Sequence, residues 1–428
     1  MKFIFVILLF FFNTSHSFEY EKLETQSGIK FWFVEDKSIP IISVSFSFRG
    51  GSSIDSSEKN GISNLMTSLM DEGTSKLTSS DFKNQMKLNG MRLNFSSQKD
   101  KIDGSFQIIA SQLEQGFELF YQALNHPRFD EVDIERVKKQ IISSIKLDES
   151  DLSTLASNKF NHFFFNEHNF SRNVKGSINT ISNIDRYDLI NFHKNAFQKN
   201  NIIIGVAGNV KKKKITELIE KVFGNLENSE KIPPVKKFSG LAKGEEIYNM
   251  KTPQTSVLFG HPGLARNNEN FFALRIANYI FGGGGFQSRL YKNVREKKGL
   301  VYSIYSYLLS YDNDGVIVGG FQTRNKSVYQ TIKNVKNEWK RIQRNGISRK
   351  EFENAKAYFK GSFTRNFTST ISIARLLQIV QYFDLGEDYF EKRDEIINNL
   401  ELQKVNEIIS KFFSSDDLFF MIVGEPEG

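Results

Sequence analysis

Short runs of aromatic and β-branched residues predict several β-strands in the first half of the chain. Gly28–Val34 and Ile41–Phe48 are two such runs, and Pro40 separates them. Met91–Ser97 and Gly104–Ser111 are close enough in sequence to form a hairpin. A further run, Asn201–Val206, ends in Ala-Gly-Asn and predicts the strand that closes this half.

The segments between these strands have the period of amphipathic helices. In Gly61–Thr74 (GISNLMTSLMDEGT) the apolar residues are Ile62, Leu65, Met66, Leu69 and Met70, which recur at helical spacing after the loop GGSSIDSSEKN. Thr78 or Ser79 can cap the next helix. The other helices expected in this half are Ser79–Leu88, Leu113–Leu124, Asp130–Leu147 and Asp185–Phe197.

The same order of segments returns in the second half. Pro253 before SVLFGH corresponds to Pro40 before IISVSF, and Gly424 after FFMIV corresponds to Gly208 after IIIGVA. EFENAKAYFKGS likewise corresponds to DIERVKKQIISS, so that the offset stays near 215 residues. A period of that length indicates a duplicated domain, and strands followed by runs of helices predict an α+β fold for each copy. The predicted domains are 18–226 and 245–428, joined by a polar linker at 227–244.

Composition and charge exclude several kinds of protein. The chain has 428 residues, a net charge of +8 and no cysteine, so disulfides and thiolate metal sites are excluded. The basic residues form no stripe with interleaved aromatic residues, which makes a nucleic-acid-binding protein a weak hypothesis. Lys211–Lys214 is the one tight basic run, and a turn or a helix start explains it.

The first 17 residues have the pattern of a signal peptide. Lys2 precedes the apolar run Phe3–Phe12, and a polar segment ends in Ser15-His16-Ser17. The apolar run is too short to span a bilayer, and no later run is long enough. Export is therefore predicted, into the periplasm if the source is a Gram-negative bacterium, with a retained membrane anchor as the alternative.

One face of the helix expected at Gly61–Thr74 carries three neutral polar residues, Asn64, Thr67 and Ser68, at positions i, i+3 and i+4. In this helix and its Gly-Ser loop the chain resembles the pitrilysin/insulinase metallopeptidases, and among them the shorter members that are similar to processing peptidases. Their helix carries the inverted zinc motif HxxEH. The resemblance places Asn64 and Ser68 at the two histidines and Thr67 at the glutamate, and it places Ser143 and Ser144 at the carboxylates from which the third ligand comes. Amide and hydroxyl groups are poor zinc ligands, and threonine cannot act as the general base, so the resemblance implies a degenerate zinc site.

The resemblance covers the mature chain and is most specific at Phe281–Ser306, FGGGGFQSRLYKNVREKKGLVYSIYS. The family has an Arg and a Tyr seven residues apart that point at the substrate, and Arg295 and Tyr302 match this pair. A guanidinium and a phenol can stabilise the oxyanion that forms during amide hydrolysis. The alternative is that Arg295 forms a surface ion pair and Tyr302 belongs to the core.

Two further features have a substrate-binding interpretation through the resemblance. Gly282, Gly283, Gly284 and Gly285 form a run that corresponds to a substrate-handling loop of non-catalytic processing-peptidase subunits, and a tight turn is the alternative. Asn94 corresponds to an asparagine beside the edge strand to which peptides add, and a scaffold role is the alternative.

The histidines do not have metal-ligand spacing, and no GxSxG motif occurs. Family members consist of two homologous halves that face each other around a chamber, and short members associate in pairs. We therefore expect an exported, non-catalytic subunit that encloses peptides and donates Arg295 and Tyr302 to the zinc site of an HxxEH-bearing partner. This chain itself would hold no cofactor. The alternatives are a stand-alone structural or peptide-binding protein and, more remotely, a zinc endopeptidase that acts alone.

Overall fold

The chain folds into two mixed β-sheets with helices packed on them, as the sequence predicts. The computed structural model describes residues 18–228 and 235–427; the predicted signal peptide and part of the predicted linker lie outside these ranges. In the first sheet the strand order is β1-β2-β6-β3-β5-β4, and in the second it is β7-β11-β8-β10-β9. The strands of the first sheet are β1 Glu21–Glu24, β2 Lys30–Glu35, β3 Ile41–Arg49, β4 Arg92–Ser97, β5 Lys101–Ile109 and β6 Ile202–Gly208. Those of the second are β7 Gly244–Asn249, β8 Gln254–Pro262, β9 Ile304–Ser310, β10 Gly315–Arg324 and β11 Phe419–Gly424.

The two sheets have the same topology, which confirms the duplication. Without β1, the first sheet has the order and directions of the second: one parallel pair (β2 with β6, β7 with β11) and otherwise antiparallel pairs. Matching side chains support this equivalence. Phe46 lies opposite Gly104 and Phe259 opposite Gly319, and in each half a Cβ on the glycine would overlap the ring. The same aromatic-over-glycine pair therefore fixes the register of both sheets.

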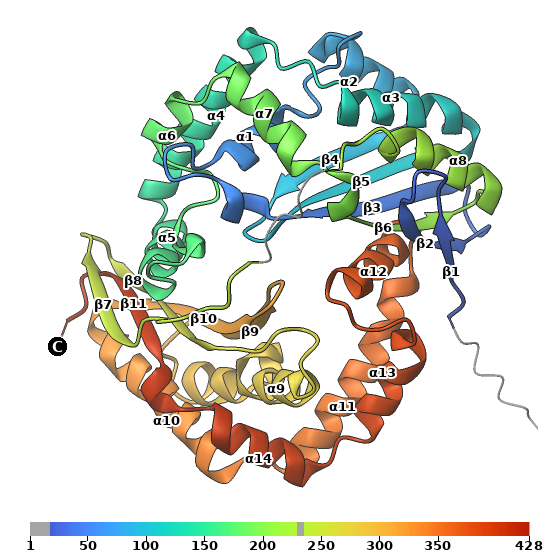
Figure 1. Cartoon of the computed structure of the whole chain (residues 1–428). Coiled ribbons are helices and arrows are strands. Elements are labelled where there is room, and N and C mark those ends of the chain that lie inside the picture. The colour runs from blue at the N-terminus through green and yellow to red at the C-terminus, as the bar shows by residue number, and fades with distance from the viewer. Residues whose placement is uncertain (1–17, 229–234, 428) are drawn as a thin grey trace, which may run out of the picture.

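Helices cover the outer side of each sheet, while α5 and α12 lie between the two sheets (Figure 1). Those of the first half are α1 Ile62–Leu69, α2 Ser79–Leu88, α3 Leu113–Asn125, α4 Glu131–Ser150, α5 Leu152–Phe164, α6 Ile178–Ser182, α7 Arg186–Ala196 and α8 Lys212–Phe223. Those of the second half are α9 Phe271–Asn278, α10 Val328–Asn345, α11 Arg349–Phe363, α12 Thr370–Tyr382, α13 Tyr389–Asn398 and α14 Leu402–Phe412. Among the described residues no helix is long and apolar enough to cross a bilayer.

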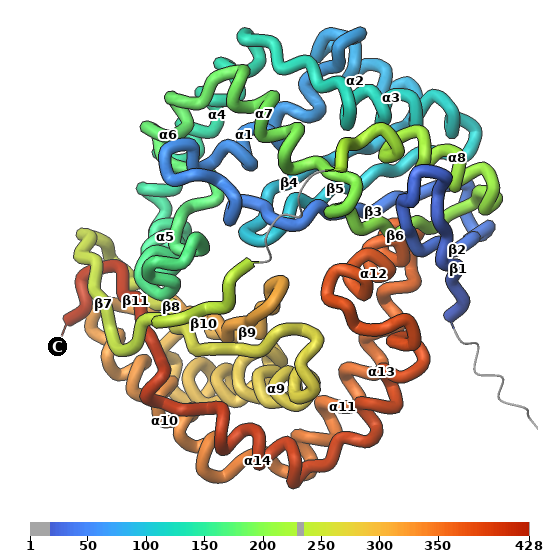
Figure 2. The backbone as a smooth tube through the Cα atoms, in the orientation of Figure 1, coloured from blue at the N-terminus to red at the C-terminus, as the bar shows by residue number. Residues whose placement is uncertain are grey.

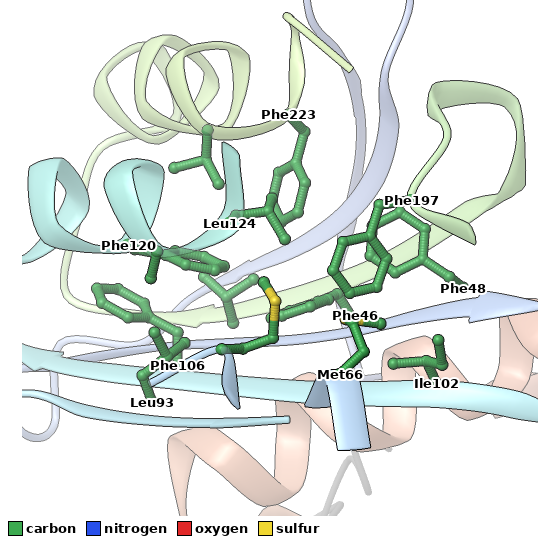
Figure 3. Close-up of a cluster of buried hydrophobic side chains, with 14 of the residues drawn as sticks. Phe46, Phe48, Met66, Leu93, Ile102, Phe106, Phe120, Leu124, Phe197 and Phe223 are labelled. Atoms are coloured by element: carbon green, nitrogen blue, oxygen red, sulfur yellow. The ribbon is translucent and has the colours of Figure 1, made fainter. Parts of the chain in front are cut away.

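The hydrophobic core of the first half lies between its sheet and the helices α3 and α8. Phe46 of β3 contacts Phe120 of α3 and Phe223 of α8, with ring centroids 5.4 and 5.5 Å apart (Figure 3). Phe106 of β5 stacks on Phe120 at 4.8 Å. Packing these aromatic side chains together removes a large apolar area from water, and this burial stabilises the first half.

One helix of each half packs on the sheet of the other half. α12, from the second half, contacts β3 and β6, while α5, from the first half, contacts β8 and β11 (Figure 2). The α12 contact combines apolar packing of Leu377 with polar groups: Gln378 lies within hydrogen-bond reach of Ser45 and Ser47. The α5 contact is aromatic, with Phe160 and Phe164 packed where Gly260 leaves room on β8. Because each half contributes a helix to the sheet of the other half, the two halves are held together with the inner faces of their sheets opposite each other.

A buried polar cluster joins the hairpin turns of the two sheets. Tyr382, at the end of α12, donates a hydrogen bond to Asp100 Oδ2 (3.0 Å), which also accepts from the backbone N–H of Asp312 (3.0 Å). Arg49 forms an ion pair with Asp312, and its guanidinium lies 4.6 Å from the Tyr382 ring centroid. These groups satisfy one another away from water, so they couple the two halves electrostatically.

The helices of the first half differ from the prediction in two ways. The helix expected at Gly61–Thr74 ends at Leu69, because Gly73 adopts φ +104 and Glu72 turns to pair with Lys83. Helices α5 and α6 have no counterpart in the sequence prediction. The predicted helix Ser79–Leu88 has the same ends as α2, which Thr78 caps, and the other predicted helices of this half are present with ends shifted by one to three residues. The basic run is the start of α8.

Candidate functional site

Helix α1 carries the positions that correspond to the zinc motif, and a buried carboxylate holds its start. Asp55 Oδ2 accepts hydrogen bonds from the backbone N–H of Gly61 (2.8 Å) and from Ser63 Oγ (3.1 Å). Burial raises the pKa of Asp55 to about 7. Asp55 was not identified from the sequence, because an aspartate in a Gly-Ser loop belongs to no motif that would distinguish it. α1 is therefore anchored by a carboxyl group that lies outside the motif.

The three motif positions bond within α1 itself. Thr67 Oγ1 and Ser68 Oγ both donate to the backbone carbonyl of Asn64, at 3.0 and 2.8 Å. Thr67 is buried, while Asn64 and Ser68 are half-buried. Hydroxyl groups that bond back to the preceding turn have their hydrogen atoms committed to the helix.

The fourth position, Ser144 on α4, lies beside an ammonium group. α4 packs against α1, and Lys175 Nζ donates to Ser144 Oγ (2.7 Å) and to Asp148 Oδ2 (2.6 Å). Ser143 is exposed on the next position of α4. Sequence reasoning missed Lys175, because its contact with α4 joins segments about 30 residues apart.

These residues do not fit a zinc ion. Catalytic zinc takes neutral imidazole nitrogens and carboxylate oxygens, whereas the side chains here are one amide and three hydroxyls, the last of them next to a cation. Among the described residues, no three His, Cys, Asp or Glu side chains gather in an arrangement that could hold a metal ion. His261 is buried and His193 half-buried, and each ring bonds a backbone carbonyl; burial lowers the pKa of His193 to about 4.

Arg295 and Tyr302 lie beside each other on the surface. The Arg295 guanidinium is 5.4 Å from the Tyr302 ring centroid and 4.6 Å from that of Tyr291. Tyr302 is 86% exposed, so it is not a core residue. No ion pair of Arg295 appears among the described residues; its charge contacts rings instead. Both side chains are therefore available to an external group.

The glycine run leads into the same surface, and it continues a helix rather than forming a simple tight turn. Tyr279–Gly283 extends α9 as a π-helical turn, and the backbone N–H of Gly284 donates to the carbonyl of Tyr279 (2.7 Å). A Cβ on Gly282 would lie 2.5 Å from Ser306 Oγ on β9, while Gly285 has φ +55 and open space around it. Phe286 follows, 70% exposed, and packs edge-on against Tyr291. One aromatic row thus connects the glycine run to Arg295.

Asn94 lies on β4, the edge strand of the first sheet, where it pairs with Ser105. It lines a cavity of about 400 Å³ between the inner face of this sheet and α12, whose Arg375 and Gln378 form the opposite wall. The free edge of β4 leaves backbone groups available for an added strand.

Comparison with known proteins places this fold and site in one family. The model of the insulinase family, peptidase family M16, matches residues 31–178, and the model of the peptidase M16 inactive domain matches residues 183–359. The chain is 25% identical over 411 residues to an uncharacterized zinc protease, YmxG, of Bacillus subtilis, covering 94% of this chain and 97% of that one. It is 24% identical over 413 residues to the non-peptidase homolog YmxG of Helicobacter pylori, covering 94% and 93%.

Solved structures share the fold. A peptidase M16 inactive domain from Pseudomonas fluorescens superposes with a TM-score of 0.91 at 23% identity, covering 96% of this chain and 98% of the other. A chain of complex III2 from Candida albicans superposes with a TM-score of 0.77 at 17% identity, covering 95% and 96%. At such identities these likenesses establish the architecture alone. With both family models matched in order along its two halves, the chain belongs to peptidase family M16, the insulinase and pitrilysin metallopeptidases.

Proposed function

We propose that this chain is a non-catalytic subunit of a two-chain M16 peptidase, which pairs with a homologous chain that bears HxxEH. One observation carries the proposal: the half-buried Arg295 contacts the exposed Tyr302, while the positions of the zinc ligands hold neutral groups. A chain that has the Arg and Tyr pair but no metal ligands could contribute this pair to the active site of a second, zinc-binding chain. The name of the Helicobacter pylori relative, a non-peptidase homolog, supports the same direction.

In this role the partner's zinc would supply the activated water. This chain would help to enclose the peptide, with the β4 edge at Asn94 and the surface of the glycine run as contact regions. Arg295 would donate hydrogen bonds to the oxyanion, and the Tyr302 hydroxyl would add another. The pattern of Met1–Ser17 supports export as the setting.

The test compares turnover with assembly. The chain is purified alone and together with a homologous HxxEH-bearing chain, and zinc content and peptide cleavage are measured for each. We expect stoichiometric zinc and cleavage only in the presence of the partner. In the pair, Arg295→Ala is expected to lower kcat/KM by about 10²–10³ without changing the fraction assembled.

Arg349→Ala is the matched control, since Arg349 is exposed on α11 and its one ion pair among the described residues is with Glu353. Full activity of the Arg295→Ala pair would refute the role in trans. Tightly bound zinc and cleavage by the single chain would instead establish a peptidase that acts alone, as the names of several relatives suggest.

The second candidate is a structural or peptide-binding protein without an active partner, favoured by the likeness to a complex III2 chain. An adjacent reading frame that encodes an HxxEH-bearing homologue would support the first candidate, and its absence from the genome would support the second.

A further inference from the structure

A cavity of about 560 Å³ in the second half has an unusual lining. It lies between β9, the π-helical turn after α9, and the helices α11, α12 and α13. Arg266, Arg275 and Arg393 all reach it, and Arg365 lies on its exposed side. None of the described residues that line it is Asp or Glu. The cavity therefore brings together four positive charges and no negative one.

The three inner arginines are held mostly by neutral groups. Arg393 donates to the Phe359 carbonyl (2.6 Å) and pairs with Asp394, which is half exposed outside the cavity. Arg266 donates to Tyr389 Oη (3.0 Å). Within the described part of the chain Arg275 has no hydrogen bond or ion pair from its guanidinium; it lies 4.6 Å from the Phe359 ring centroid.

Electrostatics show that this arrangement lacks a counter-charge. Burial, followed by the positive charges of Arg266 and Arg393, lowers the pKa of Arg275 to about 10. Contacts with aromatic faces offset only part of the cost of removing a cation from water.

Arg289 in the same half, by contrast, has carboxylate partners. It donates twice to Glu351, at 2.7 and 2.8 Å, and also lies near Glu338. Arg289 thus has carboxylates within reach, whereas the three cavity arginines share none inside the cavity. A ligand oxyanion would supply what they lack.

The glycine run forms part of the same wall. Gly283, Asn278 and Ser306 line the cavity, and Ser306 Oγ donates to Asn278 Oδ1 (2.7 Å). The absence of side chains at Gly282 and Gly283 lets this turn pack directly on β9, so that the neutral wall faces the arginines.

We propose that this cavity is a binding site for the carboxylates of an acidic peptide segment. Its volume falls within the range of small-ligand sites and suits a few side chains. Three guanidinium groups match carboxylate geometry. The inference rests on the proposed function, because it names the class of peptide that the subunit handles.

The test measures binding to the full chain by itself. The probe is a peptide of about eight residues rich in Glu, compared with the same peptide carrying Gln at each Glu, by isothermal titration calorimetry at low and high salt. We expect the Glu peptide to bind at least 10-fold more tightly than the Gln peptide at low salt, with the difference shrinking as salt rises. Arg275→Gln is expected to weaken binding of the Glu peptide about 10-fold or more.

Arg349→Gln, which removes the same charge from an exposed site, is expected to change the affinity less than 2-fold. Arg365→Gln serves as a second variant, because an exposed position leaves folding intact. Equal binding of the Glu and Gln peptides, or unchanged binding in both Arg275→Gln and Arg365→Gln, would overturn the proposal. Tripolyphosphate that binds through Arg275 while the Glu peptide does not would also overturn it, by showing that the ligand is a free oxyanion.

The outcome is independent of the partner assay. Loss of acidic-peptide binding leaves the effect of Arg295→Ala on turnover untouched, and an inactive pair leaves the peptide affinity of the single chain untouched. Failure of one proposal can thus be told from failure of the other.

Discussion

Replacement of Asp55 by Asn should make the stability of the chain less dependent on pH. Asp55 is buried at the start of α1, where one carboxylate oxygen accepts from Gly61 and Ser63 and the other has no hydrogen-bond partner among the described residues. Burial raises its pKa from 3.8 to about 7, since the charged form loses its hydration. The asparagine has nearly the same shape, keeps an acceptor for the Gly61 N–H and is neutral at every pH.

The sign follows from the direction of this shift. A carboxyl group whose pKa is higher in the folded than in the unfolded protein favours folding fully below pH 3.8, and that contribution is lost as the pH rises through about 7. At about 1.4 kcal/mol per pH unit, the interval from pH 5 to pH 7 corresponds to about 3 kcal/mol. The free energy of unfolding of Asp55→Asn, relative to wild type, should therefore rise by about 3 kcal/mol between pH 5 and pH 8.5.

Urea unfolding at a series of pH values between these limits provides the measurement. Glu149→Gln, at an exposed position near the end of α4, is the matched control and should follow the wild-type curve. If the difference between Asp55→Asn and wild type stays constant over the series, Asp55 is already ionised at pH 5 in the folded chain, and the reasoning from burial fails.

Two further substitutions test the packing of the site and the joint between the halves. Gly282→Ala places a Cβ 2.5 Å from Ser306 Oγ and 2.9 Å from its backbone nitrogen, so thermal unfolding should show a loss of about 1–3 kcal/mol, whereas Gly361→Ala, with nothing within 4 Å, should be neutral or slightly stabilising. A melting temperature of Gly282→Ala equal to that of wild type would mean that the π-helical turn does not press on β9. Tyr382→Phe removes the donor to Asp100 and should cost about 1–3 kcal/mol in urea unfolding, with an unchanged curve arguing against coupling of the halves through this cluster.

Much of the fold could be predicted because the strands are dense in β-branched and aromatic residues and the duplication repeats their order. The features that were not predicted depend on contacts between segments far apart in the sequence. Helix α5 contains Ala156, Phe160 and Phe164 at intervals of four residues, after Asp151, which caps it by accepting from the Thr154 N–H. That helical signal was present, but the partner of its apolar face is the sheet of the other half, so the segment lacks the usual local context.

The candidate site shows the same contrast between features that the sequence predicts and features that depend on contacts between distant segments. Spacing alone placed Asn64, Thr67 and Ser68 on one face of a helix, whereas the pairing of Arg295 with Tyr302 came from the family resemblance; the structure places the two side chains beside each other. Sequence spacing could not indicate which charges would be buried without a counter-charge. The arginines of the cavity come from three separate segments and have no common motif, so that only the folded chain brings them together.

The structure also shows why helix α1 keeps its place with an amide and two hydroxyls at Asn64, Thr67 and Ser68. α1 is held by its apolar face, where Leu65, Met66 and Leu69 are buried in the core, and by Asp55 at its start. The hydroxyl of Ser68, like that of Thr67, bonds the preceding turn, and neither belongs to the hydrophobic cluster. Because ligand chemistry and helix anchoring depend on different side chains, replacement of the ligands costs the fold little.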